Sequence, residues 1–373
     1  MYAQRNIEFT ISIIYVISLL FVLVCLELFY KSMNKKTYCV IFGIIFFILL
    51  SFRNLGQGLN DTEGTYHPIF DWVCNTKFSK LFDTLYSNYT SPVFISLFKV
   101  LSIISLENYR IALMVISAFV VFCFELFIYR CCKNVRLGNF FFIIFIFPYA
   151  FFLLRQIIAM AFIAIALIFV NNKKIIRELF FLIIAILIHS SSIAFCLPFF
   201  VSQLLVSHFP VKRYVAIGFT CIMAGLFIFT PNVFLTIVFN VLPKNSKYYN
   251  LLSISIYQTG NGWFSMLCAN SILLILYLLF ANERDPSNSL DLISVCLFVV
   301  FTAFSYVIQD AVRISFYYGI PTMIALSGCS LSDSSRSGNK FLAKQSKNYI
   351  WNISFFVMTI YLFVILLPSN NII

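Results

Sequence analysis

Residues 137–170 read LGNFFFIIFIFPYAFFLLRQIIAMAFIAIALIFV, an apolar run of 34 residues that contains one proline and one arginine. A helix needs about 20 apolar residues to cross a bilayer, so this run is too long for one crossing. Pro148 interrupts a helix, and Arg155 favours the membrane surface over the apolar interior. The run therefore predicts two helices that meet at the outer membrane surface around Phe152–Gln156.

The same apolar composition extends over the whole chain. Of its 373 residues, 61% are hydrophobic and 11% are charged, whereas soluble domains carry about 25% charged residues. Apolar runs of 16 to 22 residues recur from end to end, which is typical of many membrane-spanning helices. No polar stretch is long enough to enclose a core of its own. The sequence predicts an all-α polytopic membrane protein in which residues 1–373 form a single integral membrane domain.

The net charge of +12 indicates membrane orientation and not nucleic acid binding. Sixteen of the 26 Lys and Arg residues lie in short segments between apolar runs, and membrane proteins keep such segments in the cytoplasm. This rule predicts about twelve crossings, with both termini outside. It also predicts outer loops at about 53–89 and 231–262. The run at 91–106 fits as a re-entrant or interfacial helix, because a crossing there would move the basic turn near residue 133 outside.

The first outer loop opens with the polar stretch SFRNLGQGLNDTEGTYHPIFD at residues 51–71. An arginine ends the preceding apolar run, and the carboxylates of Asp61 and Glu63 follow on a glycine-containing loop. Tyr66 and His67 add an aromatic and an imidazole group. This pattern suits an enzyme that holds a phosphate and activates a hydroxyl group. The alternative is a solvated loop whose arginine extends to the membrane interface.

Three arginines lie at the predicted outer ends of helices, against the usual bias that keeps arginine inside. They are Arg53, Arg155 and Arg313. A guanidinium group stays charged at any working pH and binds phosphate oxygens in pairs, so together they predict a diphosphate-binding site. Each has a structural alternative. Arg53 could cap its own helix, Arg155 could pair with a carboxylate in the packing, and Arg313 could pair with Asp310.

Four short motifs resemble, in order and spacing, those of the EpsG-like family of exopolysaccharide polymerases, which overlaps with the Wzy-type O-antigen polymerases. RNLGQGLNDTEGTY resembles that family's R-x-x-G-x-G-x-D-x-x-x-Y loop, and LLRQIIAMAF resembles its RQ-x-x-A helix start. HSSSIAFCLPFF is similar to its H-S-S segment, and DAVRISFYY to its later Arg-x-x-x-Tyr element. One departure is Asn60 with extra residues before Tyr66, where the family has a tighter G-x-D-Y. It bears on the role of Asp61 more than on the arginines.

The resemblance implies a membrane glycosyltransferase of GT-C-like architecture that acts on undecaprenyl-diphosphate-linked oligosaccharides. Such a polymerase moves a growing glycan from undecaprenyl diphosphate onto a new lipid-linked repeat unit, at the periplasmic face of the bacterial inner membrane. It needs no cofactor and no nucleic acid, and its partners besides the lipid bilayer would be a chain-length regulator and a flippase. An O-antigen ligase and a transporter of lipid-linked oligosaccharides are the alternatives. Ligases carry a larger outer loop than residues 231–262, and transporters place charges near the midplane and show repeats.

The transfer needs a base for the acceptor hydroxyl, and two residues could serve. Asp61 is a carboxylate, the usual choice in glycosyl transfer. His189, in the HSSS segment, has the pKa better matched to neutrality, and it could instead contact the diphosphate or merely lie at a helix break. We expect the substrate to be oriented by four further residues and no metal to take part, because the chain lacks metal-ligand spacing. These four are Gln156, Tyr66, Glu63 and Asp310.

Overall fold

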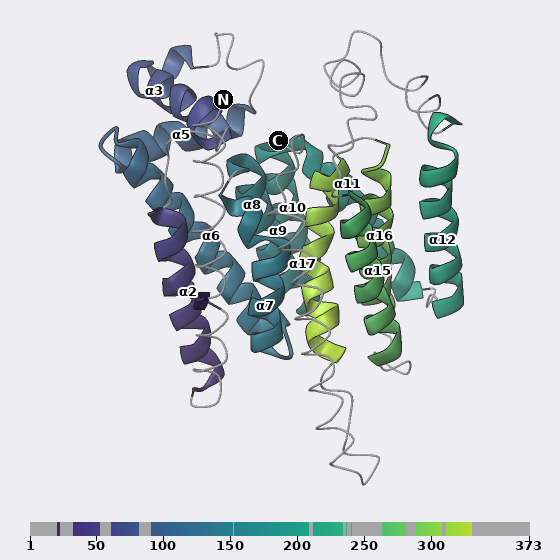
Figure 1. Cartoon of the computed structure of the whole chain (residues 1–373). Helices are drawn as coiled ribbons and strands as arrows, with labels where there is room; N and C mark the ends of the chain where they lie inside the picture. The colour runs from purple at the N-terminus through teal and green to yellow at the C-terminus, as the bar shows by residue number, and fades with distance from the viewer. Residues whose placement is uncertain are drawn as a thin grey trace, which may run out of the picture. The chain divides into compact units, whose positions relative to one another are not determined.

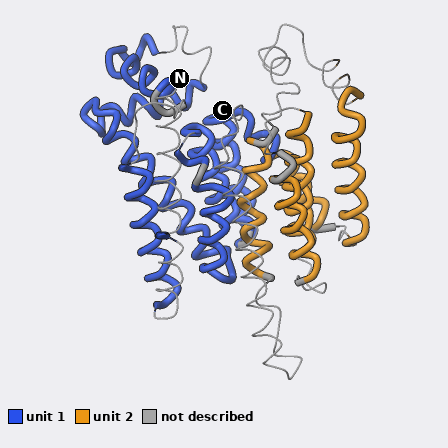
Figure 2. Tube along the Cα trace, in the orientation of Figure 1, with its two compact units in different colours: residues 1–196 blue, residues 197–373 orange. Residues whose placement is uncertain are grey.

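The computed structural model describes residues 21–22, 33–52, 61–81, 91–151, 153–208, 212–233, 236, 240, 263–280, 288–307 and 311–329. Within these residues the fold is helical throughout and contains no strand, so the all-α prediction is confirmed. The chain divides into two compact units, Met1–Cys196 and Leu197–Ile373 (Figure 2). The apolar runs at about 9–30 and 349–367 lie outside the described residues, apart from residues 21–22. The count of about twelve crossings and the GT-C-like architecture stay predictions.

The helices of unit 1 follow the apolar runs of the sequence, and asparagine side chains begin three of them. At the start of α2, Asn34 Oδ1 accepts a hydrogen bond from the Thr37 N–H at 2.8 Å, and Asn108 and Asn134 cap α6 and α7 in the same way. An Asn at this position satisfies a backbone donor that the first helical turn leaves without a partner. The longer helices of the unit are α2 (Lys35–Ser51), α3 (His67–Asn75), α5 (Pro92–Ile104), α6 (Tyr109–Cys131), α7 (Val135–Phe145), α9 (Leu154–Asn171) and α10 (Ile175–Ile188).

The break predicted within residues 137–170 is present. The helix α7 ends at Phe145, the short helix α8 (Phe147–Ala150) follows, and α9 begins at Leu154. Pro148 lies in the first turn of α8, where its missing N–H removes no hydrogen bond, whereas a continuous helix would lose one there. Arg155 is therefore the second residue of a helix, at the point where two helices meet.

Two side-chain contacts tie α2 and α6 together at opposite ends. Lys35 Nζ donates to the carbonyl oxygen of Cys132 at 3.2 Å, beside the basic turn between α6 and α7. Arg110 Nη1 donates to the carbonyl oxygen of Ser51 at 3.3 Å, at the other end of both helices. The two helices therefore run antiparallel, and the basic turn lies at the end of unit 1 opposite Ser51.

The helices α3 and α5 cover the Ser51 end of unit 1 (Figure 1). The helix α5 has 13 residues, fewer than the roughly 20 that a crossing requires. It packs against α3, α6 and α10. Its length agrees with the re-entrant or interfacial helix predicted at 91–106.

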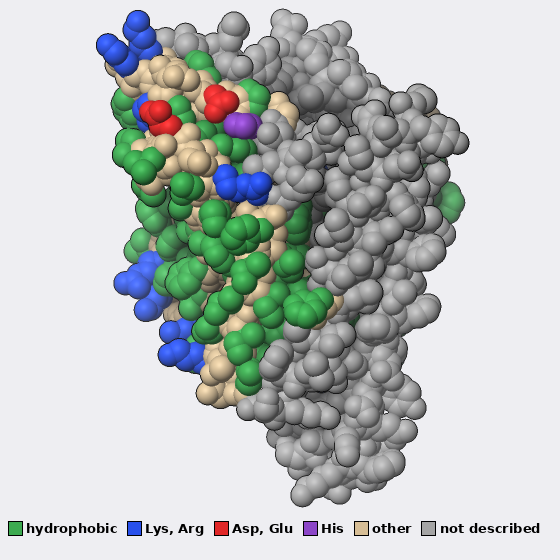
Figure 3. Space-filling view, turned by 60° about the vertical axis from the view of Figure 1, so that its left-hand side comes forward, with side chains coloured by type: hydrophobic (Ala, Val, Ile, Leu, Met, Phe, Trp, Pro, Cys, Tyr) green, Lys and Arg blue, Asp and Glu red, His purple; other side chains and the backbone are tan. Residues whose placement is uncertain are grey.

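Large apolar side chains on the long helices of unit 1 are exposed, as a lipid-facing surface would be. Phe122 is 65% exposed, and Ile44 and Ile183 are each 54% exposed. In the space-filling view, hydrophobic side chains cover a broad middle zone of the described residues, while carboxylate and imidazole groups gather near its top (Figure 3). By length and composition, Tyr109–Cys131 is the one helix among the described residues that could cross a membrane, and the other apolar helices are shorter. Soluble monomers rarely expose apolar area of this extent.

Unit 2 is organised around α16 (Asn288–Phe304), which contacts α12 (Arg213–Phe229), α15 (Trp263–Phe280) and α17 (Ala311–Cys329). Asn270 Nδ2 of α15 donates to Thr302 Oγ1 of α16 at 2.7 Å in the buried interior. Such interhelical hydrogen bonds stabilise helix pairs that lack a strong hydrophobic driving force between them. The helix α11 (Ile193–His208) contains residues of both units.

A larger side chain at Gly138 of α7 is expected to disturb the packing of α6 against α7. A Cβ atom there would lie 2.9 Å from Ile128 Cγ2 and 3.0 Å from Cys132 Sγ, so the α6–α7 pair has no room for it. We expect Gly138→Ala to destabilise the protein by about 1–3 kcal/mol, measured as a lower melting temperature in detergent. Gly218→Ala is the control, because a Cβ there meets nothing within 4 Å. An unchanged melting temperature for Gly138→Ala would contradict the packing.

Candidate functional site

Three of the motifs singled out in the sequence meet at the Ser51 end of unit 1. The helix α9, which begins with the arginine motif, contacts both the single π-helical turn η1 (Asp61–Tyr66) and the 3-10 turn η3 (Ser190–Ser192). The helix α10, which leads into η3, also contacts α5. Ser91 Oγ, which caps the start of α5, donates to the carbonyl oxygen of Ile188 at 3.1 Å. The polar first loop, the arginine motif and the HSSS segment therefore belong to one site.

Arg155 is the centre of this site. Its Nε donates a hydrogen bond to Tyr66 Oη at 3.0 Å. Its guanidinium carbon lies 5.8 Å from the ring centroid of Tyr66 and 6.0 Å from that of Phe94. The side chain is half-buried. Among the described residues no carboxylate pairs with Arg155 and its terminal nitrogens make no hydrogen bond, so these nitrogens are available to an anionic ligand.

Tyr66 is fixed by packing on its other side. The residue is 4% exposed, and its ring meets those of Phe94 and Phe98 edge to face, with centroids 5.5 Å and 6.4 Å away. Phe94 and Phe98 are themselves fully buried on α5. Because Tyr66 is held in this way, its hydroxyl sets the orientation of the Arg155 guanidinium group. Tyr66, expected from the sequence to orient substrate, contacts Arg155 in this structure.

His189 ends α10 and starts the HSSS turn. Its backbone is extended, with φ of −139° and ψ of 103°, which stops the helix. Its Nδ1 lies 3.2 Å from Ser191 Oγ, and the imidazole is half-buried. The following Ser192 is buried. The imidazole is thus held in a turn beside the start of α9, with a hydroxyl group as a polar neighbour.

The other predicted site residues are distributed as follows. Gln156 is 2% exposed in the first turn of α9. The backbones of Asp61 and Glu63 belong to η1, directly before Tyr66. Arg313 is exposed in the first turn of α17, in unit 2. Arg53 and Asp310 lie outside the described residues. The part of the chain that the structure describes contains no cluster of three His, Cys, Asp or Glu residues that could hold a metal ion.

Two cations that the sequence interpretation did not single out cap helices at this end. Arg110 binds the last-turn carbonyl of α2 at Ser51. Lys99 Nζ donates to the carbonyl oxygens of Val73 and Cys74 at 2.9 Å and 3.3 Å, near the end of α3. Cations stabilise the negative end of a helix dipole. The C-terminus of α2 thus has a cation from another helix.

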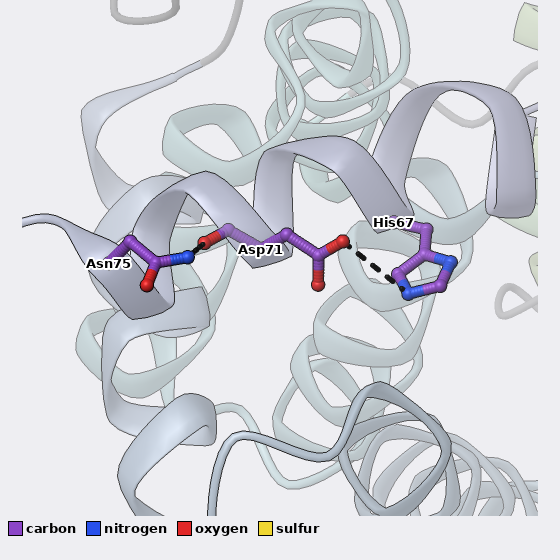
Figure 4. Close-up of polar contacts among 3 residues, drawn as sticks. All are labelled: His67, Asp71 and Asn75. Carbon is purple, nitrogen blue, oxygen red and sulfur yellow. Dashed lines mark hydrogen bonds and ion pairs between the residues drawn. The ribbon is translucent and has the colours of Figure 1, made fainter.

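A histidine–aspartate pair was also missed as a candidate. His67 Nε2 lies 3.7 Å from Asp71 Oδ2, one helical turn along α3 (Figure 4). The imidazole stacks on the ring of Tyr109, with centroids 4.4 Å apart and planes at 5°. The sequence signal was a His and an Asp at positions i and i+4 directly after the motif tyrosine.

One family of known proteins matches this chain. A family model described as the EpsG family matches residues 36–373. No curated protein and no solved structure matches the chain. The match covers the first loop, the arginine motif, the HSSS segment and the start of α17 together.

Proposed function

Because the chain belongs to the EpsG family, we propose that it is a membrane polysaccharide polymerase acting on undecaprenyl-diphosphate-linked oligosaccharides. The reaction transfers a growing glycan from one undecaprenyl diphosphate to a hydroxyl group on a second lipid-linked repeat unit. A new glycosidic C–O bond forms, the bond between the anomeric carbon and the diphosphate breaks, and undecaprenyl diphosphate leaves with the electron pair. The acceptor hydroxyl gives up one proton.

The observation that carries this proposal is the burial, charge and set of contacts of Arg155. It is a half-buried cation without a carboxylate partner among the described residues, and its planar group rests on two aromatic rings. Negative charge develops on the diphosphate as the glycosidic bond breaks, and a preorganised cation stabilises that charge most. A guanidinium group held by Nε still presents its terminal N–H groups, which match phosphate oxygens in pairs.

We also propose roles for the other residues that the sequence singled out. Arg53 and Arg313 serve as further diphosphate ligands, and Gln156, Glu63 and Asp310 orient the substrates. For Asp61, whose backbone belongs to the turn that precedes Tyr66, we propose that it orients the acceptor or acts as the base. For His189, at the η3 turn, we propose that it contacts the diphosphate or acts as the base.

The side of the membrane that the site faces is proposed from the positions of the basic turns. The Arg155 end of unit 1 is opposite the basic turn that Lys35 contacts. Because basic turns stay in the cytoplasm, the site faces the periplasmic side of the bacterial inner membrane. Both substrates are membrane-anchored, and a chain-length regulator and a flippase of the same pathway are the expected partners.

Purified full-length protein in lipid nanodiscs provides the test. The substrate is the lipid-diphosphate repeat unit extracted from the producing strain with the polymerase gene deleted. We expect a ladder of glycans that differ by one repeat unit, with one undecaprenyl diphosphate released per new bond. Unchanged substrate would refute polymerisation. A single product formed only after addition of lipid A core would indicate a ligase, and movement across vesicles without bond formation would indicate a transporter.

A further inference from the structure

We propose that His67 is the general base that takes the proton of the acceptor hydroxyl, and that Asp71 positions it. This proposal rests on the polymerase function proposed above, because it assigns a residue to that reaction. Neither residue was among the candidates for the base, which were Asp61 and His189.

The geometry of α3 supports a histidine–carboxylate pair. His67 and Asp71 are four residues apart and lie on the same face of the helix, with Nε2 and Oδ2 3.7 Å apart (Figure 4). The side chains are 37% and 60% exposed, so a substrate hydroxyl can reach them. An apo separation slightly beyond hydrogen-bond length is usual for catalytic pairs, which tighten when substrate binds.

The imidazole plane is fixed by a buried aromatic ring. Tyr109, the first residue of α6, is 5% exposed and lies parallel to the His67 ring at 4.4 Å between centroids. The ring of Phe70 also packs on that of Tyr109, with centroids 5.4 Å apart. A helix-borne imidazole held against a packed ring keeps its nitrogens in one direction, which a base in a flexible loop does not.

The pair lies beside the proposed diphosphate site. His67 directly follows Tyr66 in the chain, so their Cα atoms are about 3.8 Å apart. Tyr66 contacts Arg155 on one side of the backbone, and His67 contacts Tyr109 on another. The proposed base is thus carried by the residue next to Tyr66, and the Tyr66 hydroxyl binds the cation proposed to stabilise the leaving diphosphate.

The proton balance is straightforward. In the proposed step Nε2 carries its proton towards the Asp71 carboxylate, and Nδ1 accepts the proton of the hydroxyl group as the hydroxyl oxygen bonds to the anomeric carbon. The carboxylate stabilises the imidazolium that forms, and water takes the proton after the product leaves. A carboxylate in this role holds the tautomer and the orientation of the ring. Two cations at this end of unit 1 bind backbone carbonyls: Lys99 binds those of Val73 and Cys74 on α3, and Arg110 binds that of Ser51.

We assign His189 to the diphosphate and not to the base. Its Nδ1 lies 3.2 Å from the Ser191 hydroxyl. A protonated His189 is better suited to a second contact with the diphosphate.

The test measures turnover of the full-length protein with the extracted lipid-diphosphate repeat unit. For His67→Ala and His67→Gln we expect kcat to fall by about a hundredfold or more, with binding of undecaprenyl diphosphate unchanged. For Asp71→Asn we expect a fall of about tenfold in kcat, since the ring keeps its place but loses the charge that stabilises it. The control is Asn75→Ala on the next turn of the same helix. Asn75 Nδ2 binds the backbone oxygen of Asp71 and not its carboxylate, so a change within about twofold is expected.

Chemical rescue separates a base from a packing group. The position is partly exposed, so added imidazoles should restore part of the turnover of His67→Ala. We expect the restored rate to rise with the basicity of the imidazole used. Rescue that is independent of basicity, or wild-type kcat in His67→Ala, would overturn the assignment. A wild-type protein that forms no ladder would instead refute the polymerase function itself. Loss of turnover in Asp61→Asn or His189→Gln but not in His67→Ala would place the base there.

Discussion

Arg155→Ala is expected to lower polymer formation by about 10²–10³-fold, the loss typical of removing one preorganised charge-stabilising group. The leaving diphosphate would lose the guanidinium group that the ring faces of Tyr66 and Phe94 support. Arg155→Lys should restore little of the lost polymer formation. Lysine keeps the charge but cannot donate paired hydrogen bonds from a planar group while also donating to Tyr66. Glycan length in cells should therefore collapse to a single repeat unit in both variants.

Gel analysis of surface glycan, at matched protein levels in the membrane, measures this effect. Arg177→Ala is the matched control, because Arg177 also lies over an aromatic ring, that of Phe169 at 5.8 Å, but is exposed at the start of α10. That end of α10 is opposite the proposed site, so normal polymer is expected. Full-length polymer from Arg155→Ala would show that this arginine does not bind the diphosphate.

Tyr66→Ala is expected to lower polymer formation nearly as much as Arg155→Ala. Truncation of a buried aromatic residue costs about 3–5 kcal/mol, and here it also removes the hydroxyl that holds Arg155 Nε at 3.0 Å. Tyr66→Phe keeps the contacts with Phe94 and Phe98 and removes the hydroxyl alone. A hydrogen bond to a charged group contributes about 1.5–3 kcal/mol. We therefore expect a loss of at least about tenfold in turnover for Tyr66→Phe and a greater loss for Tyr66→Ala.

A double-mutant comparison tests whether the loss of turnover in Tyr66→Phe arises through Arg155. If Tyr66 acts through the guanidinium group, Tyr66→Phe should change turnover much less in the Arg155→Lys background than in the wild type. Tyr214→Phe, at an exposed tyrosine of α12, is the control for hydroxyl removal. Additive losses in the double variant would mean that Tyr66 contacts the substrate directly, and normal polymer from Tyr66→Ala would remove both roles.

Helix positions could be predicted because their signals are local. The N-caps at Asn34, Asn108 and Asn134 each precede an apolar run, and Pro148 breaks the long run where two helices were expected. A cap or a proline acts on the nearest turn of backbone, whatever the rest of the chain does. The family motifs are equally local, so the sequence alone indicated the EpsG family and pointed to Arg155 and His189.

The partners of these residues were decided by packing. Arg155 and Tyr66 are 89 positions apart, and Ser91 is 97 positions from the Ile188 carbonyl that it binds. Lys99 was assigned no role from the sequence, yet it caps the end of α3. The stacked pair of His67 and Tyr109 likewise depends on how α3 lies on α6.

The apolar character of the helices explains why these contacts could not be predicted from the sequence. A helix that is apolar on nearly every side has no polar stripe to show which face meets protein and which meets lipid. The sequence determined that the chain forms apolar helices, where several of them begin and end, and which family it belongs to. Only the tertiary structure decided which helix faces meet. That choice depends on the fit of side chains from distant segments, such as Tyr66, which contacts both Arg155 and Phe98.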